Sequence, residues 1–193
     1  MNNHQPLTMN HQPPKTGFTL VEMLVVIAIL AILMAMMVPA AGMILRRAKL
    51  STAKGDAGVV VTVLLKYQAE YNRWPGFYKP TQGEKHLTDK VWVDAMSPEP
   101  RQQGDPPSEF NFKHIVFFEP GRKALAPADD PNAGAFVDPW GTPFQYQLDI
   151  DGDGQCAHPN KDVGGDIPLR AIAWSAGPDH DHTTWDDNAM SWE

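Results

Sequence analysis

The sequence is almost free of cysteine. Cys156 is the single cysteine in 193 residues, so no disulfide can form within the chain. An exported domain of this size that lacks a disulfide depends on its hydrophobic core or on a bound metal ion.

Clustered basic residues and familiar catalytic motifs are also missing. Lys and Arg are grouped no more densely than in Arg46-Arg47-x-Lys49, so we expect no nucleic-acid partner. The sequence has no Gly-x-Ser-x-Gly, no paired metal-binding His motif and no phosphate loop, so we expect no enzymatic activity. Charge is distributed unevenly, with a net of +4 over residues 1–128 and −11 over residues 129–193. An acidic C-terminal third indicates either strong solvation or a bound cation.

A third absence is that of charge between residues 18 and 38. This segment, FTLVEMLVVIAILAILMAMMV, carries a single charge at Glu22. As a helix it would be about 30 Å long, enough to cross a bilayer, and it is apolar on every face. In a secretory signal peptide the small residue follows the apolar run, whereas here Gly17 precedes it, so we expect the run to be retained. A carboxylate costs about 2–3 kcal/mol at the bilayer centre, which leaves two readings of Glu22: it stays at the wet interface, or it has a specific partner.

Residues 15–22, KTGFTLVE, resemble the processing site of type IV prepilins. The resemblance implies cleavage between Gly17 and Phe18 by prepilin peptidase, N-methylation of Phe18, and a role for Glu22 in assembly. Charge neutralisation at low dielectric explains that role, because the new amine of Phe18 can pair with Glu22 of a neighbouring subunit.

The same resemblance implies a leader over residues 1–17, a transmembrane and filament-core helix over residues 18–45, and a soluble head over residues 46–193. It implies a single-pass inner-membrane protein with a cytoplasmic N-terminus and a periplasmic head, which then enters a periplasmic filament. The expected partners are further copies in a helical filament, an inner-membrane assembly platform, an assembly ATPase and membrane lipid. The basic residues at 46, 47 and 49 would by themselves favour the opposite orientation.

For the head, the sequence predicts an α+β, pilin-like fold in which the amphipathic half of a long helix packs on a small antiparallel sheet. Pro39 is expected to break the helix ladder after the apolar run, which gives a kink or a stretch without i→i−4 bonds. Apolar residues then recur at helical spacing over residues 46–72, although the β-branched run at residues 59–63 suits a strand. The recurring positions are Val60, Leu64, Tyr67, Tyr71 and Trp74.

Beyond that helix we expect a loop region over residues 76–110. It contains a short helix near residues 89–96 and a proline-rich irregular stretch at residues 97–108. Strands are predicted at residues 115–118, 142–148 and 169–174. Trp140 and Trp174 are expected in the core.

Asp149-x-Asp151-x-Asp153-Gly154 places carboxylates at alternate positions and ends on a glycine that permits a sharp turn. This pattern is similar to the first half of an EF-hand or dockerin-type calcium loop. The twelfth position is Asn160 rather than a glutamate, and the alternative is an Asp-Gly hairpin turn with solvated carboxylates. We expect calcium on the spacing of the ligands.

Two further segments resemble the major pseudopilin of type II secretion: VDPWGTPFQY at residues 137–146, and WSAGPD at residues 174–179 followed by Asp186-Asp187. The resemblance implies a calcium site formed by Asp179, Asp186, Asp187 and backbone carbonyls near Ser175. In place of the family's Gly-rich stretch this chain has HDHTTW at residues 180–185. Its two histidines, His180 and His182, are candidate zinc ligands, but no third soft ligand is nearby and we expect both to be exposed loop residues.

The resemblance predicts a structural subunit of a type II secretion pseudopilus. The alternative is a type IV pilus or competence pilin for adhesion, motility or DNA uptake, and a minor subunit is not distinguished from a major one.

Overall fold

The computed structural model describes residues 17–76, 81–99, 109–121 and 124–192, with only the backbone described at residues 36–41. The predicted leader, apart from Gly17, and most of the predicted proline-rich stretch therefore lie outside the described residues. The chain divides into two compact units, residues 1–44 and residues 45–193. The elements, in order, are α1, β1, α2, β2, β3, β4, β5 and a short 3₁₀ helix, η1.

The long helix α1 runs over Leu20–Tyr71 and includes residues from both units. The predicted helix at residues 46–72 is confirmed. It ends at Tyr71, because the next residue, Asn72, has a φ of 53° and leaves the right-handed helical region. The expectation of a stretch outside the helix at Pro39 is wrong, since helical structure is continuous across this position. A single proline removes its own backbone donor, and the neighbouring hydrogen bonds maintain the helix.

Within the residues that the structure describes, no helix is long and apolar enough to cross a membrane. The predicted span at residues 18–38 includes three residues whose side chains lie outside the description.

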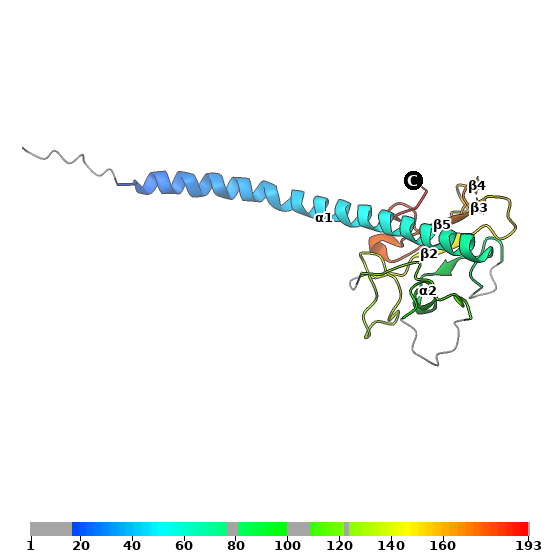
Figure 1. The fold of residues 1–193 in the computed structure, drawn as a ribbon. Coiled ribbons are helices and arrows are strands. Elements are labelled where there is room, and N and C mark those ends of the chain that lie inside the picture. The colour runs from blue at the N-terminus through cyan, green and yellow to red at the C-terminus, as the bar shows by residue number, and fades with distance from the viewer. Residues whose placement is uncertain (1–16, 77–80, 100–108, 122–123, 193) are drawn as a thin grey trace, which may run out of the picture. The chain divides into compact units, whose positions relative to one another are not determined.

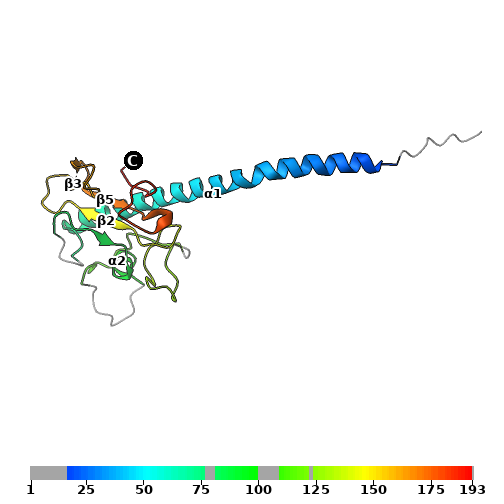
Figure 2. The ribbon, with the colours of Figure 1, turned by 180° about the vertical axis from the view of Figure 1, so that it is seen from behind.

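The main core of the second unit lies between α1 and a three-stranded sheet (Figures 1 and 2). Val60, Leu64 and Tyr67 are buried on one face of α1, as their spacing predicts. The β-branched run forms helix rather than strand because Val60 and Val63 face this core. Tertiary burial thus overrides local strand propensity.

The sheet has the order β1-β2-β5 and is antiparallel throughout. Its strands are β1 (His86–Leu87), β2 (Gln145–Leu148) and β5 (Ala171–Trp174). The predictions at residues 142–148 and 169–174 are therefore confirmed. Strand β1 was not predicted, because two residues are too few to show an alternating pattern.

Strand β5 contributes to two cores because successive side chains point to opposite faces of a sheet. Ala171 and Ala173 belong to the core beneath α1. Ile172 and Trp174 belong to a second core with Cys156 and with side chains of the C-terminal segment. That segment pairs with β5 through an isolated bridge between Trp174 and Met190. Trp174 is fully buried as expected, whereas Trp140 is half-buried.

The other elements are short. Helix α2 (Lys90–Met96) confirms the predicted short helix and is capped by the Asp89 carboxylate, which accepts a hydrogen bond from the Trp92 N–H. The strand predicted at residues 115–118 is wrong. The backbone N–H groups of Phe117 and Phe118 both donate to the Met96 carbonyl. This segment therefore bonds to the end of α2 instead of to a strand. A two-stranded hairpin, β3 (Cys156–Ala157) with β4 (Asp166–Ile167), was not predicted.

Candidate functional site

The predicted processing residues lie just before α1. Gly17 is exposed, with no atom within 4 Å of the position that a Cβ would occupy, and the Phe18 side chain is 74% exposed. Open surroundings of this kind leave the peptide bond between the two residues accessible.

Glu22 is engaged at the start of α1 by Thr19. The Thr19 backbone N–H and hydroxyl donate to Glu22 Oε2 at 2.7 Å and 2.8 Å. In return, the Glu22 N–H donates to Thr19 Oγ1 at 3.2 Å. This reciprocal arrangement is a capping box, which satisfies backbone donors that the first helical turn leaves unpaired. Glu22 therefore has a local structural role in addition to the predicted role in assembly.

The helix that follows exposes large apolar side chains along its first turns. Those with described positions between residues 20 and 34 are 45–82% exposed. A continuous apolar surface of this extent marks a segment that is covered by lipid or by other protein. The residues are Leu20, Val21, Met23, Leu24, Val25, Val26, Ile27, Ile29, Leu30, Ile32, Leu33 and Met34.

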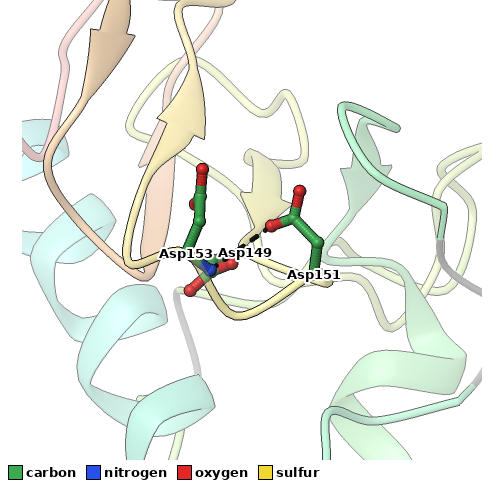
Figure 3. Close-up of side chains that lie close together, drawn as sticks. All are labelled: Asp149, Asp151 and Asp153. Atoms are coloured by element: carbon green, nitrogen blue, oxygen red, sulfur yellow. Dashed lines mark hydrogen bonds between the residues drawn. The ribbon is translucent and has the colours of Figure 1, made fainter.

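The first acidic cluster occupies the loop between β2 and β3, and Figure 3 shows its three carboxylates close together. Asp149, Asp151 and Asp153 each offer a carboxylate oxygen, and these oxygens lie within 4.8 Å of one another. Among the described residues, this is the one group of three such side chains that converges so closely. Gly154 has a φ of +84°, a conformation that favours glycine and lets the chain turn around the carboxylates.

Backbone donors already hold this turn together. The buried carboxylate of Asp149 accepts hydrogen bonds from the N–H groups of Gly152 (2.7 Å) and Gly154 (3.0 Å). Asp153 accepts from the Gln155 N–H at 2.9 Å. These hydrogen bonds shape the turn, and its three carboxylates offer oxygens to a cation. The negative charge of the turn also acts on Cys156. Burial, followed by the Asp149 carboxylate, raises the pKa of its thiol to about 12.

The second acidic cluster lies in the C-terminal loop, around the 3₁₀ helix η1 (Gly177–Asp179). Thr184 Oγ1 donates to Asp179 at 2.5 Å and the Asp181 N–H donates at 2.9 Å, and these bonds lower the pKa of Asp179. Asp186 is exposed. The three predicted ligands of this loop do not meet the close spacing found at the first cluster.

Asp187 has the least compensated carboxylate of this loop. Its Oδ1 atom is buried and has no hydrogen-bond partner. Burial, followed by the charges of Asp179 and Asp186, raises the pKa of Asp187, while Arg46 acts in the opposite direction. A buried oxygen without a donor, close to other carboxylates, is energetically costly unless a cation neutralises it.

The two histidines of the loop anchor it to the turn before β2, which was not predicted. His180 Nδ1 lies 2.6 Å from Thr142 Oγ1, and His182 Nε2 donates to the Pro143 carbonyl at 2.9 Å. His182 is half-buried, so the expectation of an exposed loop residue is wrong for it. Its burial lowers its pKa. Nothing in the local sequence indicates these contacts, because the two segments are 38 and 39 residues apart.

Comparison with known proteins gives two matches. The model of the prokaryotic N-terminal methylation motif matches residues 13–38. The type II secretion system core protein G of Pseudomonas aeruginosa is 31% identical over 132 residues, which cover 68% of this chain and 72% of that protein. No solved structure matches this chain.

Proposed function

The chain belongs to the family of the type II secretion system core protein G and is a structural subunit of a pseudopilus, and we propose that prepilin peptidase prepares it for assembly. The observation that carries this function is the 31% identity over most of both chains, together with the methylation motif at the N-terminus.

In the proposed processing step, the peptide bond between Gly17 and Phe18 is cleaved and the new amine of Phe18 is methylated. The exposed positions of both residues support this assignment. The amine then pairs with Glu22 of a neighbouring subunit, so that two charges are removed from a low-dielectric environment together. Both hydrogen bonds from Thr19 end on Oε2 of Glu22, and Oε1 accepts neither of them.

We assign residues 18–38 to the inner membrane before assembly, with the N-terminus in the cytoplasm and residues 46–193 in the periplasm. The exposed apolar side chains of the first helical turns support this anchor, because they need lipid or a neighbouring helix to cover them. The partners are further copies of the chain, an assembly platform and an assembly ATPase. The subunit's role in the filament is structural rather than catalytic.

We further propose that the head binds calcium at its C-terminal loop, with Asp179, Asp186 and Asp187 as ligands. The unpartnered, buried Oδ1 of Asp187 and the neighbouring negative charges fit a hard divalent cation, which takes oxygen ligands. When bound, the ion would neutralise this charge and stabilise the native head by mass action.

The turn containing Asp149, Asp151 and Asp153 is the second candidate for calcium. Oxygens on opposite sides of one calcium ion lie about 5 Å apart, and the carboxylates of this turn meet that distance. Backbone N–H groups already occupy both oxygens of Asp149. Calcium binding at this turn therefore needs its own test, separate from that of the C-terminal loop.

Mass spectrometry of the full chain extracted from membranes tests the processing step. We expect a protein that begins at methylated Phe18. The matched control is a Gly17→Leu variant, which should keep its leader because a bulky residue replaces the small one at the cleavage site. An intact N-terminus in the wild type, or an unaffected Gly17→Leu variant, would refute the assignment.

A further inference from the structure

We propose that Asp138 is a positioning residue that sets the calcium affinity of the C-terminal loop through Ser175 and Gly177, without contacting the ion. This inference rests on the calcium binding proposed above. It concerns the side chains of Asp138, in the turn before β2, and of Ser175, directly after β5, which are not among the candidate carboxylate ligands.

Asp138 is buried, with 4% of its surface exposed, and its two carboxylate oxygens have different partners. Oδ1 accepts hydrogen bonds from the N–H groups of Trp140 and Thr142, both at 3.0 Å. The Asp138 N–H donates to the Thr142 carbonyl at 2.9 Å, which closes the turn. Oδ2 accepts from the Ser175 hydroxyl at 2.5 Å. Hydrogen bonds to an ionised group are short and strong, so this carboxylate fixes the orientation of the Ser175 hydroxyl.

Ser175 connects the beginning and the end of the acidic loop. Because its hydroxyl proton is directed to Asp138, its oxygen accepts from the Gly177 N–H at 2.9 Å. Its own N–H donates to the carbonyl of Ala189 at 2.9 Å. The residue is completely buried, so water cannot readily replace either bond.

Gly177 transfers this arrangement to Asp187. Its φ is +72°, and a Cβ on Gly177 would lie 2.6 Å from the Asp187 carbonyl oxygen. The two backbone segments are therefore in direct contact, and a shift of Gly177 displaces Asp187. One continuous chain of contacts therefore runs from the turn to the candidate ligand, through Asp138, Ser175, Gly177 and Asp187.

This chain resembles the support that surrounds the ligands in many metal sites. Residues that orient a ligand without touching the metal change its affinity by about 10–100-fold when they are replaced. We therefore expect Asp138 to affect calcium affinity more strongly than a polar residue that supports the same strand but not the loop.

Calorimetric titration of the full chain in detergent with calcium tests the proposal. Ser175→Ala and Asp138→Asn should each weaken calcium binding about tenfold or more. Ser175→Thr keeps the hydroxyl and should restore wild-type affinity. Ser191→Ala is the matched control, since Ser191 Oγ accepts the Ala173 N–H at 3.0 Å on the same strand and is not part of the chain of contacts. It should lower the melting temperature without changing calcium affinity.

The outcomes separate the two proposals. If the wild type binds no calcium, the calcium proposal itself is overturned. If the wild type binds calcium and Ser175→Ala binds equally well, or Ser191→Ala weakens binding to the same extent, the positioning role of Asp138 is overturned. Circular dichroism identifies variants that do not fold. If Ser175→Ala does not fold, the calcium affinity of the isosteric Asp138→Asn decides whether the positioning role holds. If neither variant folds, both residues are assigned to the core instead.

Discussion

Thr19 and Glu22 cap each other at the start of α1, with the Thr19 backbone N–H donating to Glu22 Oε2 at 2.7 Å while the Glu22 N–H donates to Thr19 Oγ1. The carboxylate proposed to join neighbouring subunits therefore also begins the helix within its own subunit. Loss of assembly after removal of Glu22 could have either cause, and suitable substitutions can separate them.

Glu22→Gln should process normally and fail to assemble. Glutamine retains the acceptor that a capping box requires but lacks the charge that would pair with the Phe18 amine. Thr19→Ala is the matched variant, because it removes the cap at a cost of about 1 kcal/mol to the helix and leaves the charge in place. Electron microscopy of sheared filaments measures assembly. Filaments from Glu22→Gln, or none from Thr19→Ala, would contradict charge pairing.

Calcium removal should lower the melting temperature of the full chain in detergent. Asp187→Asn should abolish this calcium response, and it should also raise the melting temperature in chelator, because burial and the nearby Asp179 charge disfavour the charged form of Asp187 and raise its pKa. The sign follows from linkage: stability falls as the pH rises from the ordinary carboxyl pKa through the raised one, and the full loss remains at higher pH.

Asp151→Asn tests the other candidate site by the same measurement. Asp151 is exposed, so its replacement should leave the melting temperature in chelator near that of the wild type. If the C-terminal loop is the calcium site, Asp151→Asn should keep the full calcium response. A response lost in Asp151→Asn and kept in Asp187→Asn would move the proposed site to the turn after β2.

Stability in chelator should fall as the pH is lowered from 7 through the ordinary histidine pKa of about 6.5. Burial lowers the pKa of His182 despite the nearby Asp138 and Asp181 charges, and Lys85 acts in the same direction as burial. The unfolded chain then binds more protons than the folded chain between the lowered pKa and 6.5, so stability rises with pH in that window.

His182→Gln should reduce this pH dependence, because its amide can still donate to the Pro143 carbonyl but does not titrate. Part of the dependence should persist, since burial also lowers the pKa of His86. Thermal melts at several pH values measure the stability of the wild type and of His182→Gln. If stability depends equally on pH in the two proteins, the assignment to His182 is contradicted.

Leu64→Ala should reduce the free energy of unfolding of the head by about 2–5 kcal/mol, the usual cost of a cavity in a packed core. Leu64 is fully buried against the sheet, whereas the adjacent Leu65 is 37% exposed and provides the control. Leu65→Ala should have a much smaller effect. Chemical denaturation followed by tryptophan fluorescence measures both, and similar losses would contradict the proposed packing of α1.

Long elements with a periodic apolar pattern could be predicted from the sequence. The stripe containing Val60, Leu64 and Tyr67 extends over several helical turns, so its periodicity outweighs local strand propensity. The segment containing Phe117 and Phe118 was misassigned because its apolar residues converge on one carbonyl, that of Met96, which no alternation pattern can indicate.

For the candidate sites, the sequence indicated residue types and not their contacts. The acidic character of the C-terminal loop was evident, and so was the spacing of Asp149, Asp151 and Asp153. The link from Asp138 to Ser175 spans 37 residues and depends on how the turn before β2 meets the end of β5. Such contacts follow from tertiary structure, so only the fold reveals them.

The bridge between Trp174 and Met190 has a consequence for how the protein is made. The Ser191 N–H donates to the Ala173 carbonyl, so the outer edge of β5 is completed by Met190 and Ser191. A chain that emerges from the ribosome N-terminus first exposes Trp174 until Met190 and Ser191 follow. Residues up to Ser191 must therefore be synthesised before the second core can close, and a subunit that lacks Met190 and Ser191 would be open to proteases.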